Sequence, residues 1–130
     1  MAIDSWATLR YLESSANLQS SVERATGRRP STTQAREVGV CLQQGRLFYG
    51  AAASTEMAIR PLLQFYGMLA LAKALVIGYN GINLSTLPQS HGLSDVSEPC
   101  KNIADLKVRV GGENAGMFQR FNDSTMLQLR

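Results

Sequence analysis

The chain has 130 residues, of which 45% are hydrophobic and 18% charged, and its formal net charge is +3. This length fits one domain around a single core. The low share of charged residues predicts that another subunit, a partner protein or a further segment covers part of the apolar surface. The mild positive charge is weak support for nucleic-acid binding. No P-loop, dinucleotide-binding glycine pattern, HExxH or GxSxG motif is present, so the common enzyme motifs are absent and no cofactor is expected.

The ends of the chain and its cysteines carry few signals. Residues 1–6 include an acidic group and no apolar run, so we expect no secretory signal. We therefore expect a cytoplasmic location. Cys41 and Cys100 have no CxxC or Cys/His spacing, which predicts neither a metal site nor a disulfide framework. Cys41 is expected inside a helical core. The abrupt end at residues 127–130 predicts a short version of a longer protein.

A first helix is predicted from about Ser5 to Ala25, with Asp4 or Ser5 as its N-cap. Gly27 ends it. A cluster of basic side chains lies at that end. Its expected role is to complement the helix dipole and keep the surface soluble, and this role is favoured over phosphate binding. The cluster consists of Arg24, Arg28 and Arg29.

A second helix is predicted from about Thr33 to Ala53, after a polar connector. Three glycines on it, Gly39, Gly45 and Gly50, would let a neighbouring helix come close. Each costs about 1 kcal/mol relative to alanine, so packing must compensate.

A third helix is predicted at residues 61–79, because Pro61 suits a first helical turn and Gly81 a helix end. The segment is apolar on nearly every face, which predicts a central helix buried by protein on all sides. It is almost long enough to span a membrane, but Gln64 and Lys73 disfavour insertion, so no membrane contact is expected.

The remaining chain is predicted to be a turn-rich loop over residues 80–98, then a half-exposed strand with the alternation of residues 106–110. Gly111 and Gly112 suit a hairpin turn, and residues 116–121 suit a return strand or a short helix. The predicted fold is therefore mainly α, with a three-helix core, a central buried helix and a small β element near the C-terminus. One domain, 1–130, is expected, with a helical core at 1–79 and a loop plus small β/α element at 80–130.

The polar residues that interrupt the apolar centre are the candidates for a ligand-binding site: Arg60, Tyr66 and Lys73 on the third helix, and the single histidine, His91. Tyr66 and Lys73 are seven residues apart and so share a helix face. A lysine in a core helix snorkels to solvent or pairs with a carboxylate more often than it binds a ligand. His91 can act as an acid or base near neutral pH, but a histidine that only holds its loop is the more common case.

The run Arg60-Pro61-Leu62-Leu63, the following Phe-Tyr-Gly and Leu-Ala-Lys-Ala stretches, and His91-Gly92-Leu93 together resemble the bacterial YaaC-like family. Trp6 to Ser14 and the Phe48-Tyr49-x-Ala-Ala segment fit the same pattern. Phe65 departs from it, since a tyrosine is usual there, and the resemblance covers the N-terminal part of the family's length. The resemblance implies that Arg60, Tyr66, Lys73 and His91 share a motif and line a common cleft, and it supplies no reaction.

Two classes of function follow. The favoured one is a non-enzymatic helical interaction or assembly module that binds itself, a partner protein or a missing C-terminal segment. The alternative is an RNA-acting nuclease of the HEPN type, or a nucleotide- or nucleic-acid-binding domain, that uses Arg60, Lys73 and His91. The HEPN pattern is not matched, because its Arg and His lie a few residues apart on one helix and these two are separated by a helix and a loop.

Overall fold

A computed structural model describes residues 4–99, 102–111 and 116–125. They form two compact units, residues 1–86 and residues 87–130, and each is considered by itself. Cys100 and Gly112 lie outside the described residues. The prediction of a mainly α-helical fold with a small β element near the C-terminus is confirmed. The helices are α1 Ser5–Leu12, α2 Ser15–Thr26, α3 Thr32–Ala53, α4 Arg60–Asn80 and α5 Met117–Ser124. The strands are β1 Leu93–Asp95 and β2 Val108–Val110, and 3-10 turns lie at Leu84–Thr86 and Ile103–Asp105.

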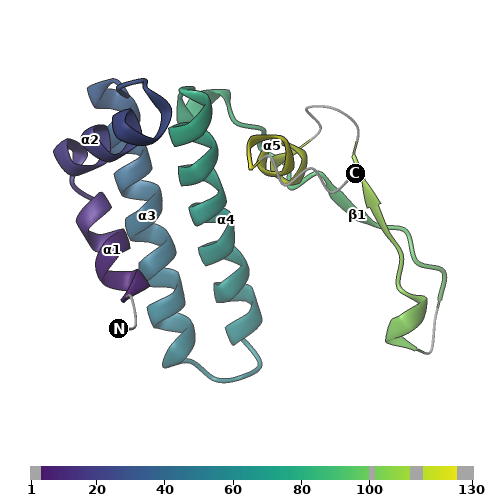
Figure 1. Cartoon of the computed structure of the whole chain (residues 1–130). Helices are drawn as coiled ribbons and strands as arrows, with labels where there is room; N and C mark the ends of the chain where they lie inside the picture. The colour runs from purple at the N-terminus through teal and green to yellow at the C-terminus, as the bar shows by residue number, and fades with distance from the viewer. Residues whose placement is uncertain (1–3, 100–101, 112–115, 126–130) are drawn as a thin grey trace. The chain divides into compact units, whose positions relative to one another are not determined.

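The first unit is a helical bundle whose centre is an antiparallel hairpin of α3 and α4 (Figure 1). The short helices α1 and α2 pack on α3, and α2 also contacts α4. Local signals set the bounds of α3: Ser31 and Gln34 form a capping box, in which each side chain bonds the other residue's backbone N–H. Pro61 lies in the first turn of α4, and Gly81 ends α4 with a left-handed backbone, φ 64°.

The predicted first helix is wrong in one respect, because the structure divides it into α1 and α2. Ser14 has an extended backbone, with ψ 125°, and is the N-cap of α2. Glu13 ends α1, and its carboxylate accepts two hydrogen bonds from the guanidinium of Arg46 on α3, at 2.6 Å and 3.0 Å. The break turns the chain so that both short helices can pack against α3.

Glycines bring the helices of the bundle close together. A Cβ atom on Gly39 would lie 2.7 Å from the backbone oxygen of Glu13, so α1 ends directly on α3. A Cβ atom on Gly67 of α4 would lie 2.8 Å from the ring of Tyr49 on α3, and one on Gly45 would overlap the side chain of Leu71. The predicted close approach therefore occurs at Gly39 and Gly45. At Gly50 the space is open, so that part of the prediction is wrong.

The prediction that α4 is buried on all sides is also wrong. Its fully buried residues are mainly small ones in contact with α3, and large apolar side chains elsewhere on the helix are exposed. The bundle has too few helices to surround α4, because α1 and α2 cover α3 instead. Buried residues of α4 are Gly67, Ala70, Ala74, Val76 and Ile77.

Side chains from the preceding segments hold the C-terminal end of α4. Arg28 Nη2 donates to the carbonyl of Gly78 at 2.8 Å, and Gln34 Nε2 donates to the carbonyl of Gly81 at 2.7 Å. The carboxylate of Glu37 accepts from the backbone N–H of Leu84 at 2.8 Å. The last carbonyls of a helix lack partners within the helix, so these contacts satisfy groups that would otherwise need water.

The second unit contains an antiparallel β1–β2 ladder in which Leu93 pairs with Val110 and Asp95 with Val108. All six strand residues are exposed. The strand predicted near residues 106–110 is confirmed, but its partner is the upstream β1 and not a return strand. The segment that begins at Gly116 becomes α5, the helical alternative. The backbone of Gly116 lies so close to Gly92 that a Cβ atom there would overlap it.

Candidate functional site

Three of the four predicted site residues lie on one helix, and that helix keeps two of them apart. Arg60 is the first residue of α4 and Lys73 lies thirteen positions later. At 1.5 Å per residue they are separated by about 20 Å along the axis, so a small ligand cannot contact both. Tyr66 and Lys73 share a face, as their spacing predicts, about 10 Å apart along the axis.

Arg60 has a structural contact. Its Nη2 donates to the backbone carbonyl of Thr55 at 3.1 Å, which holds the connection between α3 and α4. Its Nε is buried and has no hydrogen-bond partner among the described residues.

Tyr66 belongs to an aromatic cluster across the hairpin. Its ring stacks on Phe48 of α3 with centroids 5.6 Å apart, and it meets the edge of Phe65 at 5.7 Å. Such pairs contribute about 0.5–1.5 kcal/mol beyond the area they bury. Tyr66 nevertheless stays 43% exposed, so these ring contacts do not bury it.

Lys73 is half-buried and lies near Cys41 of α3. Burial raises the pKa of the Cys41 thiol, the ammonium of Lys73 opposes that rise, and the carboxylate of Glu37 adds to it. Cys41 is 2% exposed, as expected of a core residue, and a thiol with a raised pKa is a poor nucleophile. The half-buried position of Lys73 is the one expected of a lysine that extends along the apolar surface towards solvent.

His91 is an exposed residue of the second unit. Its backbone carbonyl accepts from the N–H of Phe118 at 3.0 Å, while Ser90 accepts from Met117 at the same distance. Both bonds satisfy amides in the first turn of α5, so this loop supports the start of that helix. Within the described residues no group of three or more His, Cys, Asp or Glu could hold a metal ion.

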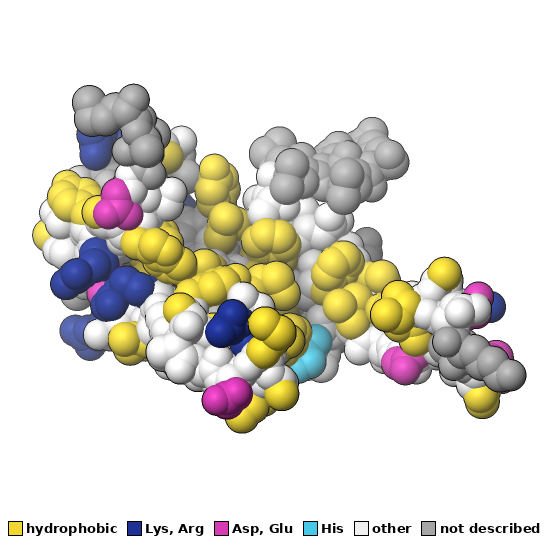
Figure 2. Space-filling model, turned by 90° about the horizontal axis from the view of Figure 1, so that it is seen from below, with side chains coloured by type: hydrophobic (Ala, Val, Ile, Leu, Met, Phe, Trp, Pro, Cys, Tyr) yellow, Lys and Arg dark blue, Asp and Glu magenta, His cyan; other side chains and the backbone are white. Residues whose placement is uncertain are grey.

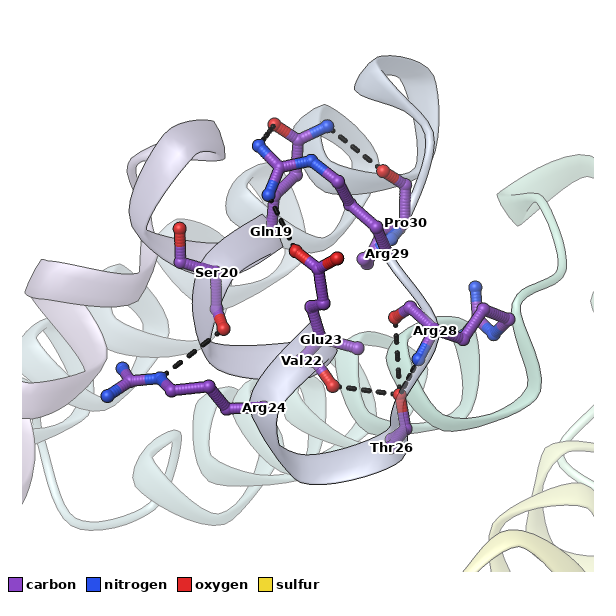
Figure 3. A network of polar contacts seen from close by, with 9 residues as sticks. All are labelled: Gln19, Ser20, Val22, Glu23, Arg24, Thr26, Arg28, Arg29 and Pro30. Atoms are coloured by element: carbon purple, nitrogen blue, oxygen red, sulfur yellow. Dashed lines mark hydrogen bonds and ion pairs between the residues drawn. The ribbon is translucent and has the colours of Figure 1, made fainter.

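The basic cluster at the end of α2 is occupied by structural contacts (Figure 3). Arg29 forms an ion pair with Glu23 at 2.8 Å, and Arg24 donates to the carbonyl of Ser20 within its own helix. Arg28 donates a hydrogen bond from Nη2 to the carbonyl of Gly78, as described above. These contacts agree with the helix-end role predicted for the cluster.

Sequence reasoning missed an apolar stripe, the α4 stripe, which begins at the N-cap residue Ile59 and continues along α4 with Leu62, Tyr66 and Leu69. Their spacing of three, four and three residues is the a/d pattern of a helix that pairs with another helix. Ile59, Leu62 and Tyr66 are exposed and Leu69 is half-buried. Lys73 continues the stripe after four more residues. The spacing was visible in the sequence, but the apolar residues on every other face of α4 concealed it.

Hydrophobic side chains also gather at the end of the bundle where α3 and α4 are connected, with few charged side chains among them (Figure 2). Met57 and Ile59 of the connection are 76% and 51% exposed. Among the described residues, α4 is long and apolar enough to cross a membrane by length and composition, a test that core helices of soluble proteins also pass.

The fold and the stripe define a mainly α-helical protein with an exposed apolar helix face. The chain belongs to the YaaC-like protein family, whose family model matches residues 3–128. The resemblance predicted from the motifs of α4 is thereby confirmed, and it extends over nearly the whole chain. No curated protein and no solved structure matches the chain.

Proposed function

We propose that this protein is a non-enzymatic assembly module that pairs with a second copy of itself through the α4 stripe. The observation that carries the proposal is the exposure of Ile59, Leu62 and Tyr66 at a/d spacing on one helix face. Exposed apolar residues that form a continuous stripe are typical of protein–protein contact sites, whereas isolated ones are ordinary surface.

The sequence of the stripe favours an antiparallel pair centred on Gln64. Leu62 and Tyr66 lie two residues before and two residues after Gln64. In the antiparallel pair, Leu62 of one copy therefore faces Tyr66 of the other. Ile59 and Leu69 stand five residues either side and are matched in the same way. Such a self-complementary arrangement is what a two-fold interface requires.

The same register brings opposite charges together. Lys73 stands nine residues after Gln64, so in the antiparallel pair it lies opposite the connection that precedes α4 in the other copy, where Glu56 is the acidic residue. Glu56 is exposed, and its backbone carbonyl accepts from Ile59 and Arg60 at the start of α4. An ion pair at each end would fix the register more than it adds affinity.

Solution mass tests the proposal. We expect light scattering to give twice the 14.2 kDa chain mass for the wild type. Leu62→Glu places a charge in the stripe and should give a monomer. Leu47→Glu is the matched control, since Leu47 lies on the outer face of α3 and is 55% exposed against 54% for Leu62. A wild-type monomer, or a Leu62→Glu dimer, would contradict the proposal.

A charge exchange tests the register. Lys73→Glu and Glu56→Lys should each weaken association about thirtyfold, because each places like charges together at both ends of the dimer, at a cost of about 1 kcal/mol per pair. The double variant restores opposite charges and should recover most of the affinity. If the double variant associates no more tightly than the single variants, this register is ruled out.

The nucleic-acid alternative is tested on the same samples. Absorbance near 260 nm reports co-purified nucleic acid. A monomer that carries nucleic acid and loses it in Lys73→Ala with His91→Ala would favour the nucleic-acid-binding or nuclease reading over assembly.

A further inference from the structure

An apolar cavity of about 340 Å³ opens on the surface of the helical bundle, and several of its lining residues, among them Ala25 and Tyr79, are exposed. Side chains of α1 and α2 line one side, α4 the other, and residues of α3 lie between them. The cavity falls within the range of small-molecule pockets, about 300–1,000 Å³. Its apolar lining includes Leu9, Leu18, Val22, Val38, Leu42 and Leu75.

The lining offers little to a polar ligand. Its polar side chains are Ser21, Thr26 and Tyr79. Thr26 Oγ1 already donates to the carbonyl of Val22 at 2.8 Å and accepts from the backbone N–H of Arg28 at 3.2 Å. Burying a polar group without a partner costs free energy, so the body of the ligand must be apolar.

A positive charge stands at one end of the cavity. Arg28 is not itself a lining residue, but its guanidinium lies beside one, because Nη2 donates to the carbonyl of Gly78 at 2.8 Å. Arg28 is half-buried. A guanidinium has five N–H donors and matches the geometry of a carboxylate, so this end suits an anionic head group.

The cavity also limits the length of the apolar part. Along α4 its lining runs from Leu71 to Tyr79, eight residues or about 12 Å of helix. An extended chain advances about 1.2 Å per bond, as the peptide backbone does, so about ten carbons fill this length.

We propose that this cavity binds the alkyl chain of a medium-chain carboxylic acid, with the carboxylate at Arg28. The apolar lining contacts one side of the chain, and Arg28 sets which end of the cavity the carboxylate occupies. The site is separate from the α4 stripe, so ligand binding and self-association can be measured independently.

Calorimetric titration of the full chain with decanoate tests the cavity. We expect saturable binding of one decanoate per chain. Ala25→Phe introduces a ring at the lining and should weaken binding at least tenfold. Ala16→Phe is the control, since Ala16 is an exposed residue of the same helix outside the lining, and it should bind as the wild type does. Thermal melting establishes that each variant is folded. Absence of saturable binding to the wild type, or equal binding to Ala25→Phe, would overturn the proposal.

Decanol separates the two parts of the site, because it has the same chain without the charge. Arg28→Gln should weaken decanoate binding about tenfold and leave decanol binding unchanged, and Arg28→Lys should retain part of the preference for decanoate. Decanol bound as tightly as decanoate by the wild type, or an equal loss of both ligands in Arg28→Gln, would overturn the assignment of the head group.

Discussion

The helical bundle and the second unit differ in how their residues are buried. In the bundle, α3 alone buries seven residues, among them Val38, Cys41 and Leu42. In the second unit every residue of β1 and β2 is exposed, and the described buried residues there are Leu87, Gly116, Met117 and Ser124. A two-stranded ribbon without a covered face is marginally stable in water. The comparison shows that apolar residues form a core where helices pack against each other, whereas the ribbon leaves side chains such as Val108 and Val110 exposed.

Hydrogen exchange gives the largest expected contrast between the two units. The amides of Ala70 and Ala74 lie in the buried part of α4 and should exchange only on global unfolding. The amides of the β1–β2 ladder should exchange through local opening, about a thousandfold faster, given a global stability of at least 5 kcal/mol. Mass spectrometry of peptic peptides measures this. If the strand amides are as protected as those of α4, the expected difference in stability between the two units is contradicted.

Gly116→Ala tests how the second unit is held together. The new Cβ atom would overlap the backbone of Gly92, and a backbone neighbour cannot move aside cheaply. We expect a local loss of about 3 kcal/mol, the upper range for overpacking. Nuclear magnetic resonance should show altered amide shifts at the start of α5 and in β1, with the amides of α3 unchanged. Changes that reach α3 would mean that the two units fold as one.

Gly39→Ala tests the close contact between the end of α1 and α3 in the bundle. The added methyl would lie 2.7 Å from the backbone oxygen of Glu13 and should destabilise the protein by about 2 kcal/mol in urea unfolding. Gly50→Ala lies in the same helix with open space around it. It should instead stabilise the protein by about 0.5–1 kcal/mol, because alanine loses less backbone entropy than glycine. Equal effects would contradict the close contact between α1 and α3.

Glu13→Gln should have the smallest effect, and one that depends on pH. The hydrogen bond from Arg46 holds the pKa of Glu13 below its ordinary 4.5, against the opposing effect of burial. A lowered folded-state pKa stabilises the protein above pH 4.5, and this stabilisation is lost as pH falls through the folded pKa. We expect the variant to be about 1 kcal/mol less stable than the wild type at pH 7, with the difference shrinking below pH 4. A difference independent of pH would exclude this ion pair as its cause.

Parts of the candidate site could be predicted from the sequence and parts could not. The shared face of Tyr66 and Lys73 follows from helical periodicity alone. The expectation that Arg60 joins them in one cleft neglected the length of the helix that carries all three. The cavity was not predicted, since its lining comes from four helices and no short motif records that arrangement.

By itself the sequence determined the type and bounds of the long helices, because the signals are local: the Ser31–Gln34 capping box, Pro61 in a first turn, and Gly81 at a left-handed position. Only the tertiary structure decided that the first predicted helix breaks at Ser14 and which faces of α4 are covered. An apolar residue is compatible with burial against any neighbour. Whether Leu62 is buried or exposed therefore depends on how many helices surround α4, and that number is a property of the assembled fold.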